Sequence, residues 1–352
     1  MKKGLRMVSF ITLVLMCFSL LFTGCAPSKE SAPAEKAPAA PSAQAPAEKP
    51  AAEPEKVDWP KKPVQIYIPA SAGGDTDFTS RTLAKYLEKE LGQPFIITNM
   101  PGGGGAIATK QVFDANPDGY SVYYYHLGQL VFNLSGTVQQ TFNDFEIVAA
   151  AANEKLGLLA VKADSPYKNL QDLIAAAKAK PETVKYATQI GGFTYLQALI
   201  MEEVADVKFQ IVDIGPANEK NAALLGGHVD VINTGYGNVK ALVESGDFRI
   251  LCIFADERSS KVPEIPTAKE QGVDMAIERP FVFYLPKGTP AGIVDKFSAA
   301  VKKVVLENKD FAADIEKAYK MEPYYLNSKD AKTMLENYMT EFKKYESSFK
   351  GK

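Results

Sequence analysis

The sequence is poor in the residues that build disulfide-bonded or metal-bound frameworks. Its 352 residues include only three cysteines, Cys17, Cys25 and Cys252, and two histidines, His126 and His228. Three widely spaced cysteines cannot supply a disulfide framework, and two isolated histidines do not make a clustered metal site. We therefore expect neither a metal nor a cofactor.

A large excess of charge of either sign is also missing. The formal net charge is −2 and there is no long basic run outside the N-terminus. Nucleic acid is therefore not expected as a partner. Hydrophobic residues make up 46% of the chain, which is enough for a substantial core, and the length suggests more than one domain.

The apolar run at residues 8–22 is too short to span a membrane comfortably. It follows three basic residues, which is typical of a secretory signal. The run ends in LFTGC, which resembles a bacterial lipobox and would make Cys25 the lipid-modified first residue of the mature protein. We predict a lipoprotein signal peptide at 1–25, with an ordinary secretory signal as the alternative.

Aromatic and β-branched residues are absent from residues 26–56. Ala, Pro, Glu, Lys and Ser make up nearly all of this segment, so it cannot bury enough apolar surface to fold. Proline keeps such a chain extended. We predict a disordered tether over residues 26–60 that holds a folded domain away from a membrane.

Strand-like and helix-like segments alternate after residue 60. Short apolar runs at 64–68, 95–98 and 120–125 predict strands, and leucines at helical spacing before Gly92 predict a helix after the first run. This βαβαβ order favours a parallel sheet with right-handed crossovers. Further strands are predicted at 184–187, 209–212, 229–232 and 250–255, and further helices at 169–180, 194–204, 219–225, 290–306 and 329–349.

Two glycine-rich loops, at 73–74 and 99–105, follow predicted strands and precede predicted helices. Ligands of open parallel sheets bind beyond the carboxyl ends of the strands, where both loops should lie. We expect Thr76 or Asp77 to cap a helix that begins near Phe78. Free backbone N–H groups and the helix N-terminus would form an anion site. Taken alone, the first loop is equally consistent with a plain tight turn.

Two other classes of protein fit the sequence less well. Residues 103–108 nominally match a dinucleotide fingerprint, but Pro101 intrudes and the next strand ends in His126 instead of an acid. There is no Walker loop, and the G-x-S-x-G elbow of a serine hydrolase is absent. Cys252 lies in an apolar strand and is expected to be inert core. We do not expect an enzyme.

Six stretches together resemble the substrate-binding proteins of tripartite tricarboxylate transporters, also called the Bug family. They are PASAGGDTDFTSR at 69–81, NMPGGGG at 99–105, NPDGY at 116–120, LLGGHVD at 224–230, DERSSKVPEIPTAKEQG at 256–272 and LPKGTP at 285–290. Each stretch is a weak signal alone. Their order and spacing across residues 60–349 make the series specific.

The resemblance implies an α/β, two-domain clamshell like the type II periplasmic binding proteins. Each domain would be a mostly parallel sheet flanked by helices, with two hinge crossings. Residues 61–160 and 281–352 would form domain 1, and residues 161–280 would form domain 2. A monomer tethered outside the cytoplasm, at the outer face of the cell membrane or in the periplasm, would capture a small carboxylate and deliver it to membrane permease subunits. A ligand-sensing subunit for a membrane signalling partner is the alternative.

The resemblance also implies which residues bind the ligand in domain 1. Backbone N–H groups of the two glycine loops, with ordered water, would hold a carboxylate at Ser71, Ala72, Gly73, Gly74, Asp77, Gly103 and Gly104. Thr76, in the first loop, is also expected in the site. Asp75 stands where the family often has another glycine, and its carboxylate would repel a polyanion if it faced the ligand. Asp75 could instead bind an ammonium or a hydroxyl group.

In domain 2 the family's GSxxHL stretch appears without its histidine at Gly191–Leu196, which includes Gly192. We expect a less basic and more aromatic lining, made by Phe193, Tyr195, Tyr236 and Phe281, although each of these could equally be packing. Such a lining favours a ligand with an apolar or ring-shaped body and one carboxylate. Polar residues near predicted strand ends would complete the site: His126, Thr188, Thr194, Asn218 and Thr234.

Overall fold

The computed structural model describes residues 57–350, and every structural statement below concerns these residues. They form one compact unit, which contains two β-sheets. The predicted signal peptide with Cys25, and all but the last four residues of the predicted tether, lie outside the described residues. Trp59 is buried and packs against Phe297, so the folded part begins slightly before residue 60.

The first sheet has six strands in the order β11-β4-β10-β3-β1-β2. Their bounds are β1 Val64–Ile68, β2 Phe95–Asn99, β3 Ser121–His126, β4 Phe145–Glu154, β10 Arg279–Pro286 and β11 Leu326–Asn327. The predicted parallel pairing of the first three strands is confirmed. The other three pairings, β3 with β10, β10 with β4 and β4 with β11, are antiparallel. The sheet is therefore mixed, and the expectation of a mostly parallel sheet was wrong.

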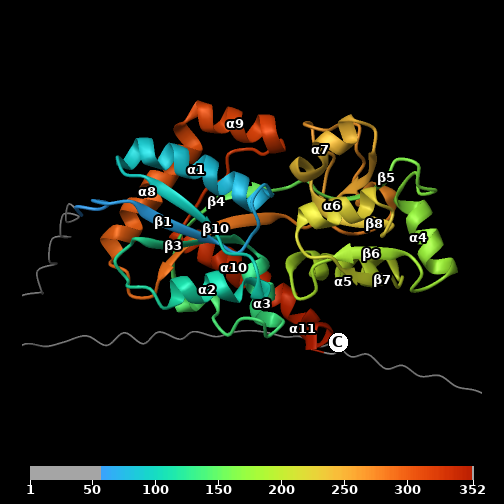
Figure 1. The fold of residues 1–352 in the computed structure, drawn as a ribbon, viewed down its shortest axis with the longest axis horizontal. Coiled ribbons are helices and arrows are strands. Elements are labelled where there is room, and N and C mark those ends of the chain that lie inside the picture. Colours follow the sequence, from blue (N-terminus) through green and yellow to red (C-terminus); the bar gives the residue numbers. More distant parts are fainter. Residues whose placement is uncertain (1–56, 351–352) are drawn as a thin grey trace, which may run out of the picture. The chain divides into compact units, whose positions relative to one another are not determined.

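Helices cover both faces of the first sheet (Figure 1). Helices α1 (Asp75–Leu91), α8 (Ala291–Glu307) and α9 (Lys309–Tyr319) lie on one side, and α2 (Ala106–Phe113), α3 (Gly128–Leu134) and α10 (Ser328–Phe342) lie on the other. The alternation in β1 explains this arrangement, because Val64, Ile66 and Ile68 point into the core under α1 while the residues between them face the other side.

The second sheet has five strands in the order β7-β6-β8-β5-β9. Their bounds are β5 Gly157–Lys162, β6 Lys185–Thr188, β7 Gln210–Asp213, β8 Val231–Gly235 and β9 Phe248–Ile253. The predicted strands β6, β7 and β8 are parallel, whereas β5 is antiparallel to both β8 and β9. The flanking helices are α4 (Leu170–Ala179), α5 (Phe193–Ala205), α6 (Ala217–Leu225) and α7 (Tyr236–Glu244). The α/β class is confirmed, with a second mixed sheet.

The chain passes between the two sheets at two neighbouring points. It leaves the first sheet after Glu154, at the end of β4, and returns at Arg279, the first residue of β10. Glu154 and Arg279 are paired in the antiparallel register of these two strands, so the crossings lie side by side. Because the described residues form one compact unit, the domain boundaries near 160 and 281 stay a prediction.

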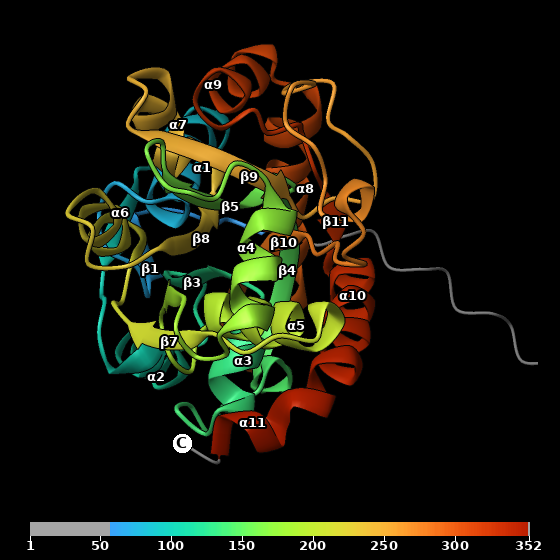
Figure 2. The same ribbon diagram turned by 90° about the vertical axis from the view of Figure 1, so that its right-hand side faces the viewer.

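The last predicted helix is interrupted. Helix α10 ends at Phe342, a 3₁₀ turn spans Lys343–Tyr345, and α11 covers Glu346–Lys350. The rings of Phe342 and Phe349 pack against Phe193 and Tyr195 of α5, 6.2 and 5.5 Å between centroids. The C-terminal segment therefore begins on the first sheet and ends against a helix of the second (Figure 2).

Candidate ligand-binding site

A cavity of about 440 Å³ lies where the ends of strands from both sheets meet. One side of its lining comes from the β1–α1 and β2–α2 loops, the end of β3 and the start of β10. The other side comes from the starts of α5 and α6, the end of β8 and one residue of α7. Both glycine loops therefore contribute to one cavity, at the strand ends where the sequence predicts them.

The β1–α1 loop is held in place by the carboxylate of Asp77. The Oδ2 atom accepts a hydrogen bond from the Gly73 N–H at 3.0 Å, and Oδ1 accepts from Arg81 Nε and Asn99 Nδ2, both at 2.9 Å. Burial opposes ionisation, but these three donors together hold the pKa of Asp77 below its usual value. Asp77 is thus bound to its own loop and is not among the residues that line the cavity.

The predicted cap of α1 was wrong. The helix begins at Asp75 with Gly74 in the N-cap position, and Gly74 has no side chain that could accept a hydrogen bond. Asp77 cannot cap because its carboxylate is already used by the loop and by Arg81. Two acidic residues, Asp75 and Asp77, occupy the first turn instead, where they favour the helix electrostatically.

Three helices begin at the cavity. They are α1, α5 and α6, whose N-cap residues Gly74, Gly192 and Pro216 provide no side-chain cap. The first N–H groups of a helix lack intrahelical partners, and the helix dipole places a partial positive charge there. Residues at all three starts line the cavity, so the backbone contributes positive potential to its walls, which the carboxylates in the first turn of α1 partly offset.

A buried ion pair joins the ligand loop to the crossing strands. Asp75 Oδ2 bonds Arg279 Nη2, and both residues are 8% exposed. The other oxygen, Asp75 Oδ1, accepts a hydrogen bond from the Thr76 N–H at 2.7 Å. The charge of Asp75 is therefore compensated within the protein, so this carboxylate is not left to repel an anionic ligand.

Two further buried charges lie close to this pair. Lys220 of α6 is 2% exposed, and its Nζ donates to the Asn233 carbonyl oxygen at 2.6 Å. Burial, reinforced by the charge of Arg279, lowers the pKa of Lys220 to about 7. Glu154, at the end of β4, is buried, and burial raises its pKa to about 7. Its Oε1 accepts from the Leu156 N–H at 2.7 Å, while Oε2 has no hydrogen-bond partner among residues 57–350.

His126 is a buried, neutral donor in this setting. Burial, with a contribution from the Arg279 charge, holds the pKa of His126 well below its usual value. Its Nδ1 accepts a hydrogen bond from the Gly128 N–H at 2.9 Å, which leaves the proton on Nε2. Its ring packs edge-on against Phe193 and Phe281, 5.6 and 5.2 Å between centroids.

The predicted site residues divide into two groups. Nine of them line the cavity: Ser71, Gly74, Asp75, Thr76, His126, Phe193, Thr194, Asn218 and Thr234. The other eight do not: Ala72, Gly73, Asp77, Gly103, Gly104, Thr188, Gly192 and Tyr236. Several of these support the lining, since Ala72 O accepts from Asn218 Nδ2 at 3.2 Å and Thr188 Oγ1 donates to Thr194 Oγ1 at 2.9 Å. Tyr236 instead lines a separate cavity of about 310 Å³.

The expectation of a less basic and more aromatic lining was wrong for this cavity. Lys220 and Arg279 both line it, and neither was predicted from the sequence. Phe281 is fully buried in the first sheet and stacks on Tyr124, and Tyr195 packs against the C-terminal segment.

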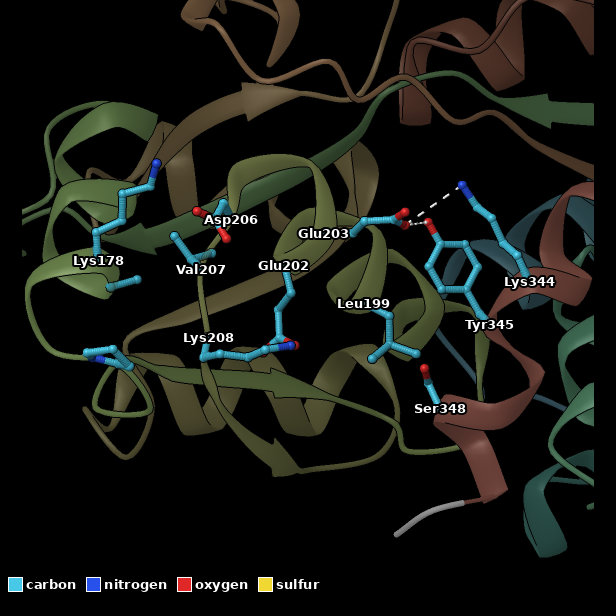
Figure 3. Close-up of a pocket in the computed structure, with 12 residues that line it drawn as sticks. Lys178, Leu199, Glu202, Glu203, Asp206, Val207, Lys208, Lys344, Tyr345 and Ser348 are labelled. Atoms are coloured by element: carbon cyan, nitrogen blue, oxygen red, sulfur yellow. Dashed lines mark hydrogen bonds and ion pairs between the residues drawn. The ribbon is translucent and has the colours of Figure 1, made fainter. Parts of the chain in front are cut away.

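A larger groove of about 820 Å³ lies elsewhere, between α5 and the C-terminal segment (Figure 3). Glu203 bonds the Tyr345 hydroxyl and lies 3.8 Å from Lys344 Nζ across this groove. Its lining contains neither glycine loop and none of the three helix starts described above. The smaller cavity is therefore the candidate ligand site.

Three further observations concern the buried thiol, metal ligands and membrane-spanning helices of the described residues. Burial raises the pKa of the Cys252 thiol to about 12, so this cysteine stays protonated inside β9. Within residues 57–350 there is no cluster of three or more potential metal ligands. No helix in the same range combines the length and apolar character that crossing a bilayer requires.

Two α/β lobes joined by adjacent crossing strands, with one cavity between their strand ends, define a solute-binding protein. The family model described as "Tripartite tricarboxylate transporter family receptor" matches residues 79–345, and the chain belongs to this family. The UPF0065 protein in the gbd 5′ region of Cupriavidus necator is 36% identical over 277 residues, covering 77% of this chain and 82% of that protein.

Solved structures have the same fold. A TctC solute-binding protein from Polaromonas is 28% identical with a TM-score of 0.62, over 81% of this chain and 98% of that one. MatC from Rhodopseudomonas palustris, solved with bound malate, is 24% identical with a TM-score of 0.74, over 82% of this chain and 100% of that one. The predicted family and two-domain architecture are thereby confirmed.

Proposed function

We propose that this protein captures a small carboxylate in the cavity between its two sheets and delivers it to the membrane subunits of a tripartite tricarboxylate-type transporter. The observation that carries the proposal is the convergence of three helix N-termini on one cavity. Such an arrangement favours an anion, and the walls include Lys220 as an additional cation. Malate in the related MatC structure supports a small carboxylate as the ligand class.

Capture would proceed by closure of the two lobes. The adjacent crossings after Glu154 and before Arg279 are the natural hinge, because few backbone torsions need to change there. Asn218 reaches from the start of α6 to the carbonyl of Ala72 in the opposite loop, which fastens the two sides of the cavity. A ligand that touches both sides favours the closed arrangement, which is then presented to the membrane partner.

We place the protein outside the cytoplasm as a monomer, lipid-anchored through Cys25 to the outer face of the cell membrane or exposed to the periplasm. The family is a receptor family of membrane transporters, which requires access to external solute. The LFTGC motif and the Pro/Ala-rich segment after it support an anchored, tethered receptor. Mass spectrometry of the mature protein tests this, since a diacylglycerol-modified Cys25 is expected at its N-terminus.

A thermal-shift screen against small carboxylates tests the proposed ligand class. A ligand at 100 times its dissociation constant should add about 2.7 kcal/mol of stability. The test variant is Gly74→Val, because Gly74 lines the cavity at an ordinary backbone φ of −88° and an added Cβ meets only Ser71 O at 4.0 Å. The variant should unfold at a somewhat lower midpoint without ligand, because valine is a poorer N-cap residue than glycine, and should lose the ligand-induced shift. No shift from any acid with ligand-free protein would refute the proposal.

A further inference from the structure

The last turn of helix α9 connects the two lobes. Helix α9 packs on the first sheet, yet its Lys317 carbonyl oxygen accepts a hydrogen bond from Lys240 Nζ of α7 at 3.1 Å. Beside it, Glu316 Oε1 lies 2.6 Å from Nζ of Lys261, which follows β9. Tyr319 is the last residue of α9, lies at the same boundary and is only 6% exposed. The end of α9 is therefore held by the lobe to which this helix does not belong.

The ring of Tyr319 contacts one helix of each lobe. It stacks on Phe78 of α1, with 4.6 Å between the ring centroids. It also lies directly against Gly237 of α7, where an added Cβ would collide with three atoms of the ring. Only a residue without a side chain lets the ring come this close to the α7 backbone. The position of the Tyr319 hydroxyl is therefore fixed by packing from both lobes.

The Tyr319 hydroxyl begins a chain of two hydrogen bonds that ends in the cavity wall. It donates to Asn238 Oδ1 at 3.2 Å, and Asn238 Nδ2 donates to Thr234 Oγ1 at 3.1 Å. Asn238 and Thr234 both line the candidate ligand cavity, whereas Tyr319 does not. Burial and the charges of Asp75 and Glu154 raise the pKa of Tyr319, so its hydroxyl keeps the proton that it donates.

The direction of these bonds decides how Thr234 faces a ligand. An amide carries its acceptor on one side and its donors on the other, so an Oδ1 atom held by the tyrosine proton leaves Nδ2 to meet Thr234. Thr234 Oγ1 then accepts, and its own proton goes to no atom of residues 57–350. With the amide turned round, Thr234 would donate to Asn238 and present only lone pairs to the cavity, which would repel an anion.

We propose that Tyr319 is a positioning residue for ligand binding: it fixes the Asn238 amide so that Thr234 presents its hydroxyl proton to an oxygen atom of the ligand. Because Tyr319 belongs to the first lobe and its two partners to the second, this relay forms only while the lobes are in contact. One tyrosine hydroxyl thereby couples the contact between the lobes to ligand affinity. The proposal rests on the proposed function and deepens it. The competing explanation is that Tyr319 serves only as packing between α1 and α7.

Calorimetric titration of the full chain with malate, succinate, adipate and benzoate, each added separately, tests the relay. Tyr319→Phe removes the hydroxyl and keeps the ring, so the variant should remain folded, which urea unfolding checks. At least one of the acids that bind the parent should bind Tyr319→Phe roughly three- to tenfold more weakly, which corresponds to the loss of one hydrogen bond.

A double-mutant cycle separates positioning from packing. Thr234→Val removes the hydroxyl that the relay presents and should weaken binding of the same acid at least as much. Tyr319→Phe should then have no further effect in the Thr234→Val background, because no proton is left to direct. Tyr86→Phe is the matched control, since Tyr86 is also buried and its hydroxyl donates to Asp314 of α9 at 2.8 Å within the first lobe. This control should leave the affinity unchanged.

Each outcome decides a specific point. If Tyr319→Phe binds every acid as the parent does, or if its effect adds to that of Thr234→Val, the relay is wrong and the proposed function stands. If Tyr86→Phe weakens binding as much as Tyr319→Phe, the loss comes from loosened packing of α9 and the relay is again wrong. If none of the four acids binds the parent, the proposed function and the relay fail together. A loss in Tyr319→Phe that disappears in the Thr234→Val background supports the relay.

Discussion

Among single residues, Glu154 makes the clearest prediction about stability. Its carboxyl has an ordinary pKa of 4.5 and a folded pKa of about 7, because burial disfavours the charged form. Between these pH values the native state holds a proton that the unfolded state has lost, so stability falls as pH rises from about 4.5 to 7. Above about pH 7 this loss is complete.

We therefore expect Glu154→Gln to be more stable than the parent at pH 8 by about 2–3 kcal/mol and to lack this pH dependence. Urea unfolding of both proteins at pH 5 and pH 8 measures the difference. Glu257→Gln removes an exposed carboxylate and is the control, expected to follow the parent at both pH values. Equal pH dependence in Glu154→Gln and the parent would contradict the prediction.

Lys220 predicts a pH dependence of ligand affinity. Burial and Arg279 lower its pKa to about 7, Asp75 opposes this shift, and Glu154 and neutral His126 are the other titratable groups of the buried cluster. An anionic ligand favours the protonated amine, so carboxylate affinity should fall about tenfold per pH unit above 7. Titrations at pH 6.5, 7.5 and 8.5 measure this slope.

Two variants distinguish the titration of Lys220 from that of Glu154 in this experiment. Glu154 also gains a negative charge as pH rises through about 7, which would weaken anion binding in the same direction. The slope should persist in Glu154→Gln and vanish in Lys220→Met. The reverse pattern would assign the titration to Glu154 and not to Lys220.

At the scale of elements, the β2–α2 loop depends on Gly105. Its φ is +89°, and an added Cβ would lie 2.1 Å from Cε2 of Phe132, so both backbone strain and a collision oppose any side chain. Gly92, the C-cap of α1, has a φ of +74° but no atom within 4 Å of an added Cβ. Comparing the two glycines separates collision from strain.

We expect Gly92→Ala to cost about 1–2 kcal/mol of stability, and Gly105→Ala to cost about 1–3 kcal/mol more. Because Gly105 lines the cavity, its replacement should also weaken ligand binding, whereas Gly92→Ala should leave affinity unchanged. Urea unfolding and calorimetric titration of both variants provide the test. Equal losses of stability in Gly92→Ala and Gly105→Ala would show that the Phe132 ring moves to make room for the new methyl group.

The sequence predicted those strands and helices that carry a clear local pattern, such as an apolar run or a capping residue. The strands β1, β2 and β3 have short apolar runs, and α4 has Asn169 as its cap, whose Oδ1 accepts from the Asp172 N–H as predicted. The strands β4 and β10 gave no such signal. Every residue of β10 is buried, so the period of two is lost, and β4 contains four consecutive alanines, which favour strands weakly.

The buried charges of the site could not be predicted from local sequence, for a different reason. The partners Asp75 and Arg279 are 204 positions apart, and nothing near Arg279 distinguishes it from a surface arginine. Lys220 occupies a helix position where most lysines face solvent. Their burial follows from how the two sheets meet, which depends on the tertiary fold and not on either segment.

For the whole molecule, the C-terminal segment links the two lobes outside the crossings. Phe349 is 8% exposed and packs against Tyr195 of α5, while Phe342 packs against Phe193, a residue that lines the cavity. These contacts support the arrangement in which both sheets line one cavity. We therefore expect them to contribute to ligand affinity as well as to stability.

Phe349→Ala should cost about 2–3 kcal/mol of stability, at or below the lower end for a buried phenylalanine because the ring lies near the surface. It should also weaken ligand binding by about tenfold, because the loosened lobe spends less time in the binding arrangement. Urea unfolding and calorimetric titration measure the two effects, and Lys343→Ala, at an exposed position of the same segment, is the control. A loss of stability with unchanged affinity would mean that the segment moves with the second sheet and plays no part in closure.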